Sequence, residues 1–148
     1  MNSNDFNKPL TFFKLESSKN ILLPLFSSSV KAGFPSPADD FIENHIDLNK
    51  LLISHVAETY LVRVSGNSMK NAEIYSEDIL IVDRSLEIKE NSIGIFTIND
   101  EFTVKRIKKI NGILYLYPEN DQYKPIKIEG NNELSVWGVV TFIIHQCK

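Results

Sequence analysis

Cysteine is almost absent from the sequence. Cys147 is the only cysteine in 148 residues, and it stands next to the C-terminal residue. Without a second cysteine, neither an intramolecular disulfide nor a cysteine-rich zinc site can form, so we expect no metal and no cofactor. This cysteine usage favours the cytoplasm as the location of the protein.

Long apolar runs and a surplus of positive charge are missing too. Residues 1–20 contain neither a basic start followed by an apolar stretch nor a long apolar span, so we expect no secretion signal and no membrane partner. The net charge of −3 and the pI of about 5.6 lack the basic footprint that drives binding to phosphate backbones. One basic run, residues 105–109, is typical of a solvated strand end. We therefore expect no direct sequence-specific DNA binding.

The composition that remains is that of an ordinary soluble globular protein, with 43% hydrophobic and 24% charged residues. A chain of this length buries roughly 70% of the surface that it exposes when unfolded, which predicts one domain with a core. Residues 1–20 show no sustained hydrophobic period and predict an irregular arm. In residues 21–37, Pro24 and later glycine and proline residues predict an extended, accessible connector.

Residues 36–55 have a helical pattern. Ser36 has N-cap chemistry and Pro37 suits the first helical position. One predicted helical face is formed by Phe41, Ile42, His45 and Ile46. A second short helix is expected after Asp47.

From Thr59 onward the pattern changes to short runs of β-branched and aromatic residues. The predicted strands are residues 60–64, 79–83, 92–98, 101–107, 113–117, 126–129 and 134–144. Asn99 and Asp100 predict a two-residue hairpin turn, because both residue types tolerate positive φ. The expected fold class is mainly β: a single domain of bent antiparallel sheets, with one or two short helices near the front and an extended N-terminal arm.

A serine nucleophile has few histidine partners in this sequence. The three histidines, His45, His55 and His145, stand in no recognisable motif, so a His-based triad has little support. A serine can instead be activated by a lysine that is neutral at working pH. This requires burial to lower the lysine pKa by roughly 2.5 to 3 units.

Lys105 is a candidate for such a base. It lies in the strand pattern "EFTVKRI", where it shares a face with Thr103 and Ile107. The residue pattern alone nevertheless favours a partly exposed strand lysine for Lys105 and a turn serine for Ser68. Spacing does not decide between these interpretations.

A resemblance does favour one of them. The stretch "VSGNSMKNAEIYSEDILIVDRS", followed 37 residues after Ser68 by the lysine of "EFTVKRIKK", looks like the peptidase domain of the LexA and UmuD family of self-cleaving SOS-response proteins. Upstream, "PLFSSSVKAGFPSPADDFIENHIDLNKLLISH" resembles the UmuD branch of that family, and "VWGVV" matches the closing strand. The resemblance covers about residues 22–144.

The resemblance implies a Ser–Lys endopeptidase that acts mainly on its own chain. Ser68 would be the nucleophile, Lys105 the general base and the Ala32–Gly33 peptide bond the substrate. Backbone N–H groups of Asn67 and Ser68 would form the oxyanion hole. Residues 1–32 would then be an arm removed on cleavage, and residues 33–148 a serine peptidase-like β domain.

The same resemblance implies partners. The activator would be the recombinase filament on single-stranded DNA, and the trimmed protein would be a subunit of an error-prone Y-family translesion DNA polymerase. A homodimer is expected as well. The apolar run of residues 136–144 suits either a dimer interface or a central core strand.

The sequence departs from the family pattern in two turns and beside the nucleophile. Asn67 stands where Asp is frequent, and glycines are frequent where this chain has Asn71, Ala72, Glu73 and Glu77; Asn71 can still adopt a left-handed conformation. Three alternatives remain open: an inactive interaction module, a repressor-like relative and a signal peptidase-like protease acting on other chains. The few residues before Gly33 argue against a helix-turn-helix repressor, and the lack of an anchor argues against the signal peptidase.

Overall fold

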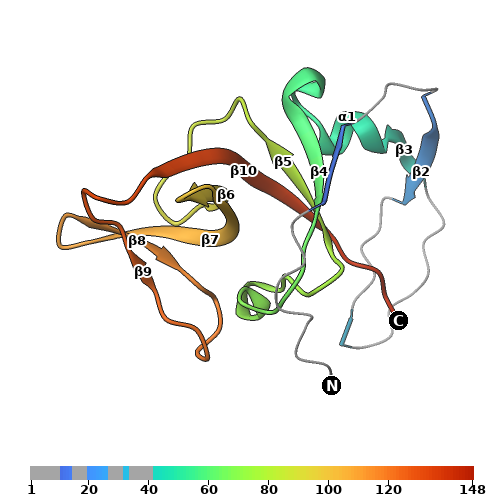
Figure 1. The fold of residues 1–148 in the computed structure, drawn as a ribbon. Coiled ribbons are helices and arrows are strands. Elements are labelled where there is room, and N and C mark those ends of the chain that lie inside the picture. Colours follow the sequence, from blue (N-terminus) through green and yellow to red (C-terminus); the bar gives the residue numbers. More distant parts are fainter. Residues whose placement is uncertain (1–10, 15–19, 27–31, 34–41) are drawn as a thin grey trace. The chain divides into compact units, whose positions relative to one another are not determined.

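The structure is a computed structural model, and it describes residues 11–14, 20–26, 32–33 and 42–148. The chain divides into two units, residues 1–15 with 55–148 and residues 16–54. The first unit holds an eight-stranded antiparallel sheet in the order β1-β4-β5-β10-β6-β7-β8-β9 (Figure 1). Its strands are β1 (Thr11–Lys14), β4 (Thr59–Arg63), β5 (Ile79–Asp83), β6 (Ile93–Ile98), β7 (Glu101–Ile110), β8 (Ile113–Tyr117), β9 (Ile126–Lys127) and β10 (Leu134–Ile144). Two 3₁₀ turns, Val56–Glu58 and Lys70–Ala72, complete it.

The predicted mainly-β fold is confirmed. Strands β4 to β10 lie where the sequence predicts them, and β7 continues to Ile110, three residues beyond its predicted end. The sheet curls on itself, because Phe12 on β1 and Phe102 on β7 have ring centroids 4.9 Å apart although four strands lie between them in the sheet order. This curl is what brings segments near opposite ends of the sheet together.

The hairpin between β6 and β7 also forms as predicted. Asn99 and Asp100 have φ values of 49° and 66°, the left-handed geometry of the two-residue turn that matches strand twist. Ile98 pairs directly with Glu101 across it. The turn therefore sets the register of β7, and with it the position of Lys105.

Strand β10 lies in the middle of the sheet, between β5 and β6. This position accounts for the length of β10, but Phe142, Ile143 and Ile144 at its end stay exposed, so the predicted dimer interface stays a prediction. The register shifts near Gly138, where a Cβ atom would stand 2.6 Å from Val82 Cγ1. Only glycine fits such a close approach between the strands.

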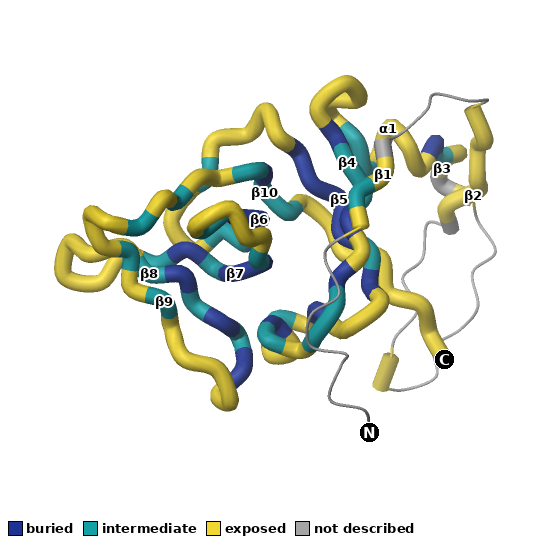
Figure 2. Tube along the Cα trace, in the orientation of Figure 1, coloured by how far each residue is buried: buried dark blue, intermediate teal, exposed yellow. Residues whose placement is uncertain are grey.

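Two clusters of buried side chains form the core of this unit, and Figure 2 shows buried stretches along β5 and β7. The larger cluster contains Met69 and Val104, which are 2% and 6% exposed. These residues directly follow Ser68 and directly precede Lys105. The packing of Met69 and Val104 in the core thus fixes the backbone on which Ser68 and Lys105 stand.

The second unit corrects the helix prediction. Residues Ile42–Asp47 form strand β3, paired antiparallel with β2 (Leu22–Phe26), and not the first helix that was expected. Pairing with a partner strand distant in sequence outweighs the local helical period. The predicted Ser36 N-cap, Pro37 and Phe41 lie outside the described residues.

The second predicted helix is confirmed as α1 (Leu48–Leu52). Its N-cap is Asp47, whose side chain accepts a hydrogen bond of 2.9 Å from the backbone N–H of Asn49. Pro24 lies in a two-stranded sheet, where a missing backbone donor is tolerated.

The N-terminal arm contains one strand that the sequence analysis missed. Residues Thr11–Lys14, predicted as part of an irregular arm, form β1 and pair with β4 from Thr11↔Arg63 to Lys14↔Tyr60. Four residues are too few for a reliable period-2 signal, which explains the error. In the described part of the chain, no helix is long and apolar enough to cross a membrane.

Candidate active site

Ser68 lies in the loop that follows β4. Gly66 has a φ of 94°, which turns the chain, and its N–H donates to Ser76 Oγ at 3.3 Å. The backbone N–H groups of Val64 and Glu77 donate to the carbonyls of Asp78 and Val64, both at 2.9 Å. Ser68 itself is half-buried, so its hydroxyl is held in place while it stays accessible.

Lys105 reaches this serine from β7. Its Nζ donates to Ser68 Oγ at 3.0 Å, to Thr103 Oγ1 at 2.9 Å and to the carbonyl of Val104 at 2.9 Å. The lysine is only 8% exposed, so it is not the partly exposed strand lysine that the residue pattern alone favours. Thr103 does share a face with Lys105, as the alternation along the strand predicts.

The electrostatic setting of Lys105 favours its neutral form. Burial lowers the pKa of Lys105 from 10.5 to about 8. No acid in the described part of the chain forms an ion pair with its Nζ to offset this loss of hydration. A fraction on the order of one tenth is then neutral at pH 7, against less than about one thousandth for an unperturbed lysine.

The three partners of Nζ also orient the neutral amine. A protonated amine donates to all three oxygens. A neutral amine keeps two N–H bonds, which can go to Thr103 Oγ1 and the Val104 carbonyl, and it has one lone pair left for the hydroxyl proton of Ser68. Geometry and charge together give the arrangement of a nucleophile beside its general base.

A turn between β8 and β9 holds the serine loop, and the sequence analysis missed it. The Asn120 side chain, 4% exposed, donates through Nδ2 to the carbonyl of Asn67 at 2.7 Å. The N–H of Asn71 donates to the carbonyl of Glu119 at 2.7 Å. The Glu119 carboxylate in turn pairs with Arg106, the residue after Lys105. An asparagine in a polar turn carries no local signal that could have identified this role.

The backbone amides of Asn67 and Ser68 are the predicted oxyanion donors. In the described part of the chain, neither N–H is engaged by another acceptor. The carbonyl of Asn67 is fixed by Asn120, and the planar trans peptide bond directs the N–H of Ser68 the opposite way. The N–H of Ser68 therefore has a fixed direction, and its role as an oxyanion donor stays a prediction.

The two turns that lack glycine do contain left-handed residues. Glu73 and Glu77 have φ values of 60° and 77°, so Glu73 is the left-handed residue of the first turn. A non-glycine residue in this conformation costs roughly 1 to 2 kcal/mol. The turns therefore keep the shape that glycine would favour.

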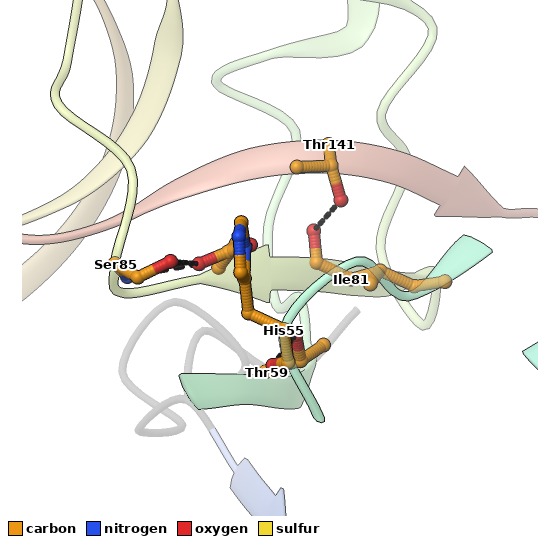
Figure 3. Close-up of polar contacts among 6 residues, drawn as sticks. His55, Thr59, Ile81, Ser85 and Thr141 are labelled. Atoms are coloured by element: carbon orange, nitrogen blue, oxygen red, sulfur yellow. Dashed lines mark hydrogen bonds and ion pairs between the residues drawn. The ribbon is translucent and has the colours of Figure 1, made fainter. Parts of the chain in front are cut away.

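His55 does not form a catalytic triad with a serine. His55 Nδ1 lies 2.6 Å from Asp83 Oδ2, and Ser85 Oγ donates to Asp83 Oδ1 at 2.6 Å, so the serine contacts the carboxylate and not the imidazole. Figure 3 shows His55 and Ser85 from this cluster, together with the bond from Thr141 Oγ1 to the carbonyl of Ile81. The cluster ties β5 to its neighbours and has no activated nucleophile.

The predicted cleavage site is exposed. Ala32 and Gly33 form a bend, and a Cβ atom added to Gly33 would meet no atom within 4 Å. They lie in the second unit, whereas Ser68 and Lys105 lie in the first.

In the described residues, no group of three or more metal-ligating side chains comes together.

The family model and the similar proteins indicate the same family for this chain. A family model described as Peptidase S24-like matches residues 24–141. MucA of Salmonella typhimurium is 38% identical over 120 residues, which are 80% of this chain and 82% of MucA. SamA of Salmonella typhimurium is 39% identical over 125 residues, 84% of this chain and 86% of SamA.

The LexA repressor of Colwellia psychrerythraea is 36% identical over 123 residues, which are 82% of this chain but 57% of the repressor. The similarity confirms the resemblance to the LexA and UmuD family that the motifs indicated. MucA and SamA are UmuD-like, and with the family match they support a function related to SOS mutagenesis. The chain therefore belongs to the S24-like peptidase family, whose members are of serine-peptidase kind.

Proposed function

We propose that the protein cleaves its own Ala32–Gly33 bond with a Ser68–Lys105 dyad. The observation that carries the proposal is the 3.0 Å contact between Lys105 Nζ and Ser68 Oγ, made by a lysine whose pKa burial lowers to about 8. Membership of a serine-peptidase family supports it independently. The small side chains at Ala32 and Gly33 would let an extended backbone approach the hydroxyl closely.

The chemistry is acyl transfer followed by hydrolysis. Neutral Lys105 takes the Ser68 hydroxyl proton as Oγ attacks the carbonyl carbon of Ala32. The backbone N–H groups of Asn67 and Ser68 stabilise the resulting oxyanion. The ammonium of Lys105 then protonates the departing nitrogen of Gly33, which leaves an ester between Ala32 and Ser68. Water, deprotonated by Lys105, hydrolyses this ester and restores the hydroxyl.

Two features would restrain the reaction until it is needed. Most of Lys105 is protonated at pH 7, and the scissile bond lies in a different unit from the dyad. An activator that favours the docked and desolvated arrangement would relieve both restraints. We propose the recombinase filament on single-stranded DNA as that activator, in line with the SOS relatives.

The cleaved protein would act in the cytoplasm as a homodimer, as a subunit of an error-prone Y-family polymerase in SOS mutagenesis. The UmuD-like relatives support the link to SOS mutagenesis. An interaction module that keeps the fold without activity is the second candidate, favoured by the exposed glutamate side chains that Glu73 and Glu77 present on turns of unchanged backbone shape. The two candidates differ in whether the purified chain cleaves itself.

The test is mass spectrometry of the purified chain after incubation near pH 7 and near pH 10. We expect a fragment beginning at Gly33 that accumulates faster at the higher pH and is absent from Ser68→Ala and Lys105→Ala. Ser65→Ala in the same loop and Lys109→Ala on the same strand are the matched controls, and both should cleave. An intact wild-type chain at both pH values, with and without the recombinase filament, would support the inactive module.

A further inference from the structure

Strand β1 belongs to the piece of chain that the proposed cleavage removes. It pairs with β4 through Thr11↔Arg63, Phe12↔Val62, Phe13↔Leu61 and Lys14↔Tyr60. In Figure 1 this strand, in blue, runs along β4, in green. The other edge of β4 pairs with β5, so β1 covers the one open edge of this end of the sheet.

Phe12 anchors the strand in a group of aromatic side chains. Its ring centroid lies 4.7 Å from that of Trp137 and 4.9 Å from that of Phe102. The Tyr60 ring lies 5.4 Å from Trp137 on the same group. The next residue, Phe13, is 45% exposed, because successive side chains point to opposite faces of a strand. We call Tyr60, Phe102 and Trp137 the aromatic socket.

Cleavage would change how strongly β1 is held. Before cleavage, the tether keeps β1 at an effective concentration in the millimolar range, which suffices for a four-residue strand. Afterwards residues 1–32 are a separate peptide, present at the far lower concentration of the protein itself. A single short strand gains too little on its own to stay bound under those conditions.

We propose that cleavage uncovers the edge of β4 and the aromatic socket, and that an extended segment of a partner protein then docks there as a replacement strand. The inference rests on the proposed cleavage at Ala32–Gly33. Main-chain hydrogen bonds to an exposed sheet edge give such a strand its affinity, and a pocket for one side chain gives it specificity. An aromatic side chain at the position of Phe12 fits the socket.

The positive charge of Arg84 beside the aromatic socket indicates which residue the partner segment should carry. Arg84 places its Cζ 4.8 Å from the Trp137 ring and 5.8 Å from the Tyr60 ring, and its Nε donates to the Trp137 carbonyl at 3.1 Å. No carboxylate in the described residues forms an ion pair with it. Strand β1 has Lys14 at the register position opposite Tyr60. Lysine carries the same sign of charge as Arg84. A partner segment with an acidic residue there complements Arg84, whereas β1 of a second copy of this chain does not.

The first test uses the full chain made uncleavable by Ser68→Ala, so it does not depend on the proposed reaction. In this background Phe12→Ala is compared with Phe13→Ala, a matched change on the exposed face of the same strand. Trp137 is the only tryptophan, so its fluorescence reports on the socket alone. We expect Phe12→Ala to increase acrylamide quenching and to speed amide exchange of Tyr60–Arg63 about tenfold, and Phe13→Ala to do neither.

The second test offers the open edge a strand in trans. A synthetic peptide of residues 8–17 is titrated into the Phe12→Ala chain, beside the same peptide with Lys14→Glu or with Phe12→Ala. The unmodified peptide should restore protection of β4, the Lys14→Glu peptide should bind several-fold more tightly, and the Phe12→Ala peptide should not bind. Failure of all three peptides to protect β4 would overturn the proposal. Protection that rises with protein concentration without any peptide would identify a second copy as the occupant and would contradict it too.

The third test follows the wild-type chain during self-cleavage. Quenching of Trp137 should rise to the level of the Phe12→Ala chain in step with the Gly33 fragment. A cleaved protein that keeps the protection of intact chain would show that β1 stays bound, and would refute the release of the socket. If no fragment forms, the proposed function fails, while the peptide experiment still decides whether the edge accepts a strand.

Discussion

Two parts of the first unit bury an ionisable side chain, and the two environments have opposite effects on its charged form. At the dyad, Lys105 is buried among a hydroxyl and a carbonyl with no counter-ion, and its pKa falls to about 8. At β5, burial raises the pKa of Asp83, but hydrogen bonds from Ser85 and His55 outweigh it, so the pKa lies below 3.8. Burial without a partner makes a base that can lose its proton, whereas burial with donors stabilises the charge. The first arrangement suits catalysis and the second suits structure.

We expect the largest effect from a substitution that gives Lys105 a counter-ion, because its environment would then stabilise charge as that of Asp83 does. Thr103→Asp places a carboxylate where Nζ now has a hydroxyl at 2.9 Å, and an opposite charge at that range raises a lysine pKa by 1 to 3 units. We expect self-cleavage at pH 7.5 to slow by about 100-fold, measured as appearance of the Gly33 fragment. Thr103→Asn is the neutral control of the same shape and should retain most of the rate. Equal rates for the Asp and Asn variants would show that a counter-ion does not govern the base.

The pH dependence of the wild-type chain tests the unaltered site. If neutral Lys105 is the base, the cleavage rate rises about tenfold per pH unit below pH 8 and levels off above it, because the folded-state pKa is about 8. A rate that continues to rise to pH 10 would show that the lysine is hydrated in solution.

The same pKa shift has a consequence for stability. Because the pKa in the folded state is lower than 10.5 in the unfolded chain, the unfolded chain binds more protons between pH 8 and pH 10.5. The contribution of Lys105 to the free energy of unfolding therefore rises with pH across this window, by about 3 kcal/mol in total. Denaturant unfolding of the wild type and of Lys105→Met over this range measures it, since the methionine variant lacks this component.

A substitution in the turn that holds the serine loop tests the position of Ser68 separately from the pKa of Lys105. Asn120→Asp keeps the shape of the side chain but sets an acceptor against the Asn67 carbonyl, where Nδ2 now donates at 2.7 Å. Loss of alignment of the Ser68 N–H should lower the plateau rate about tenfold, less than the loss of an oxyanion donor itself. The midpoint of the pH profile should stay near 8. Asn132→Asp is the control, at a half-buried asparagine that donates to the Lys127 carbonyl. A shifted midpoint only in the Asn120 variant would contradict a purely positional role.

The smallest effect is expected at the charge-stabilised cluster. His55 is half exposed, so its contact with Asp83 is screened, and His55→Gln should lower the free energy of unfolding by less than about 1 kcal/mol. Because the pKa of Asp83 is depressed in the folded state, the stabilisation is present above the unfolded pKa and is lost as the pH falls below it. Thermal unfolding at pH 7 and pH 3 measures this, and the cleavage rate should not change. A slower cleavage in His55→Gln would show that the Asp83 cluster affects the Ser68–Lys105 dyad.

Prediction from the sequence succeeded where the signal is local. Strands β5, β8 and β10 were located to the residue, and the Asn99–Asp100 turn was predicted from two residue types that tolerate positive φ. It failed where a strand needs a distant partner. The helical period of residues 42–47 was outweighed by pairing with β2, and β1 is too short to show a period.

The candidate site divides in the same way. Sequence by itself determined which serine and lysine to consider, because the stretches around Ser68 and Lys105 resemble the motifs of the LexA and UmuD family, whereas the residue pattern alone did not distinguish them. Only the tertiary structure decided that Lys105 is buried beside Ser68 with a lowered pKa, and that Asn120 holds the serine loop. The physical reason is that desolvation and hydrogen-bond geometry depend on neighbours that the curled sheet brings from far along the chain. No residue pattern within one strand contains that information.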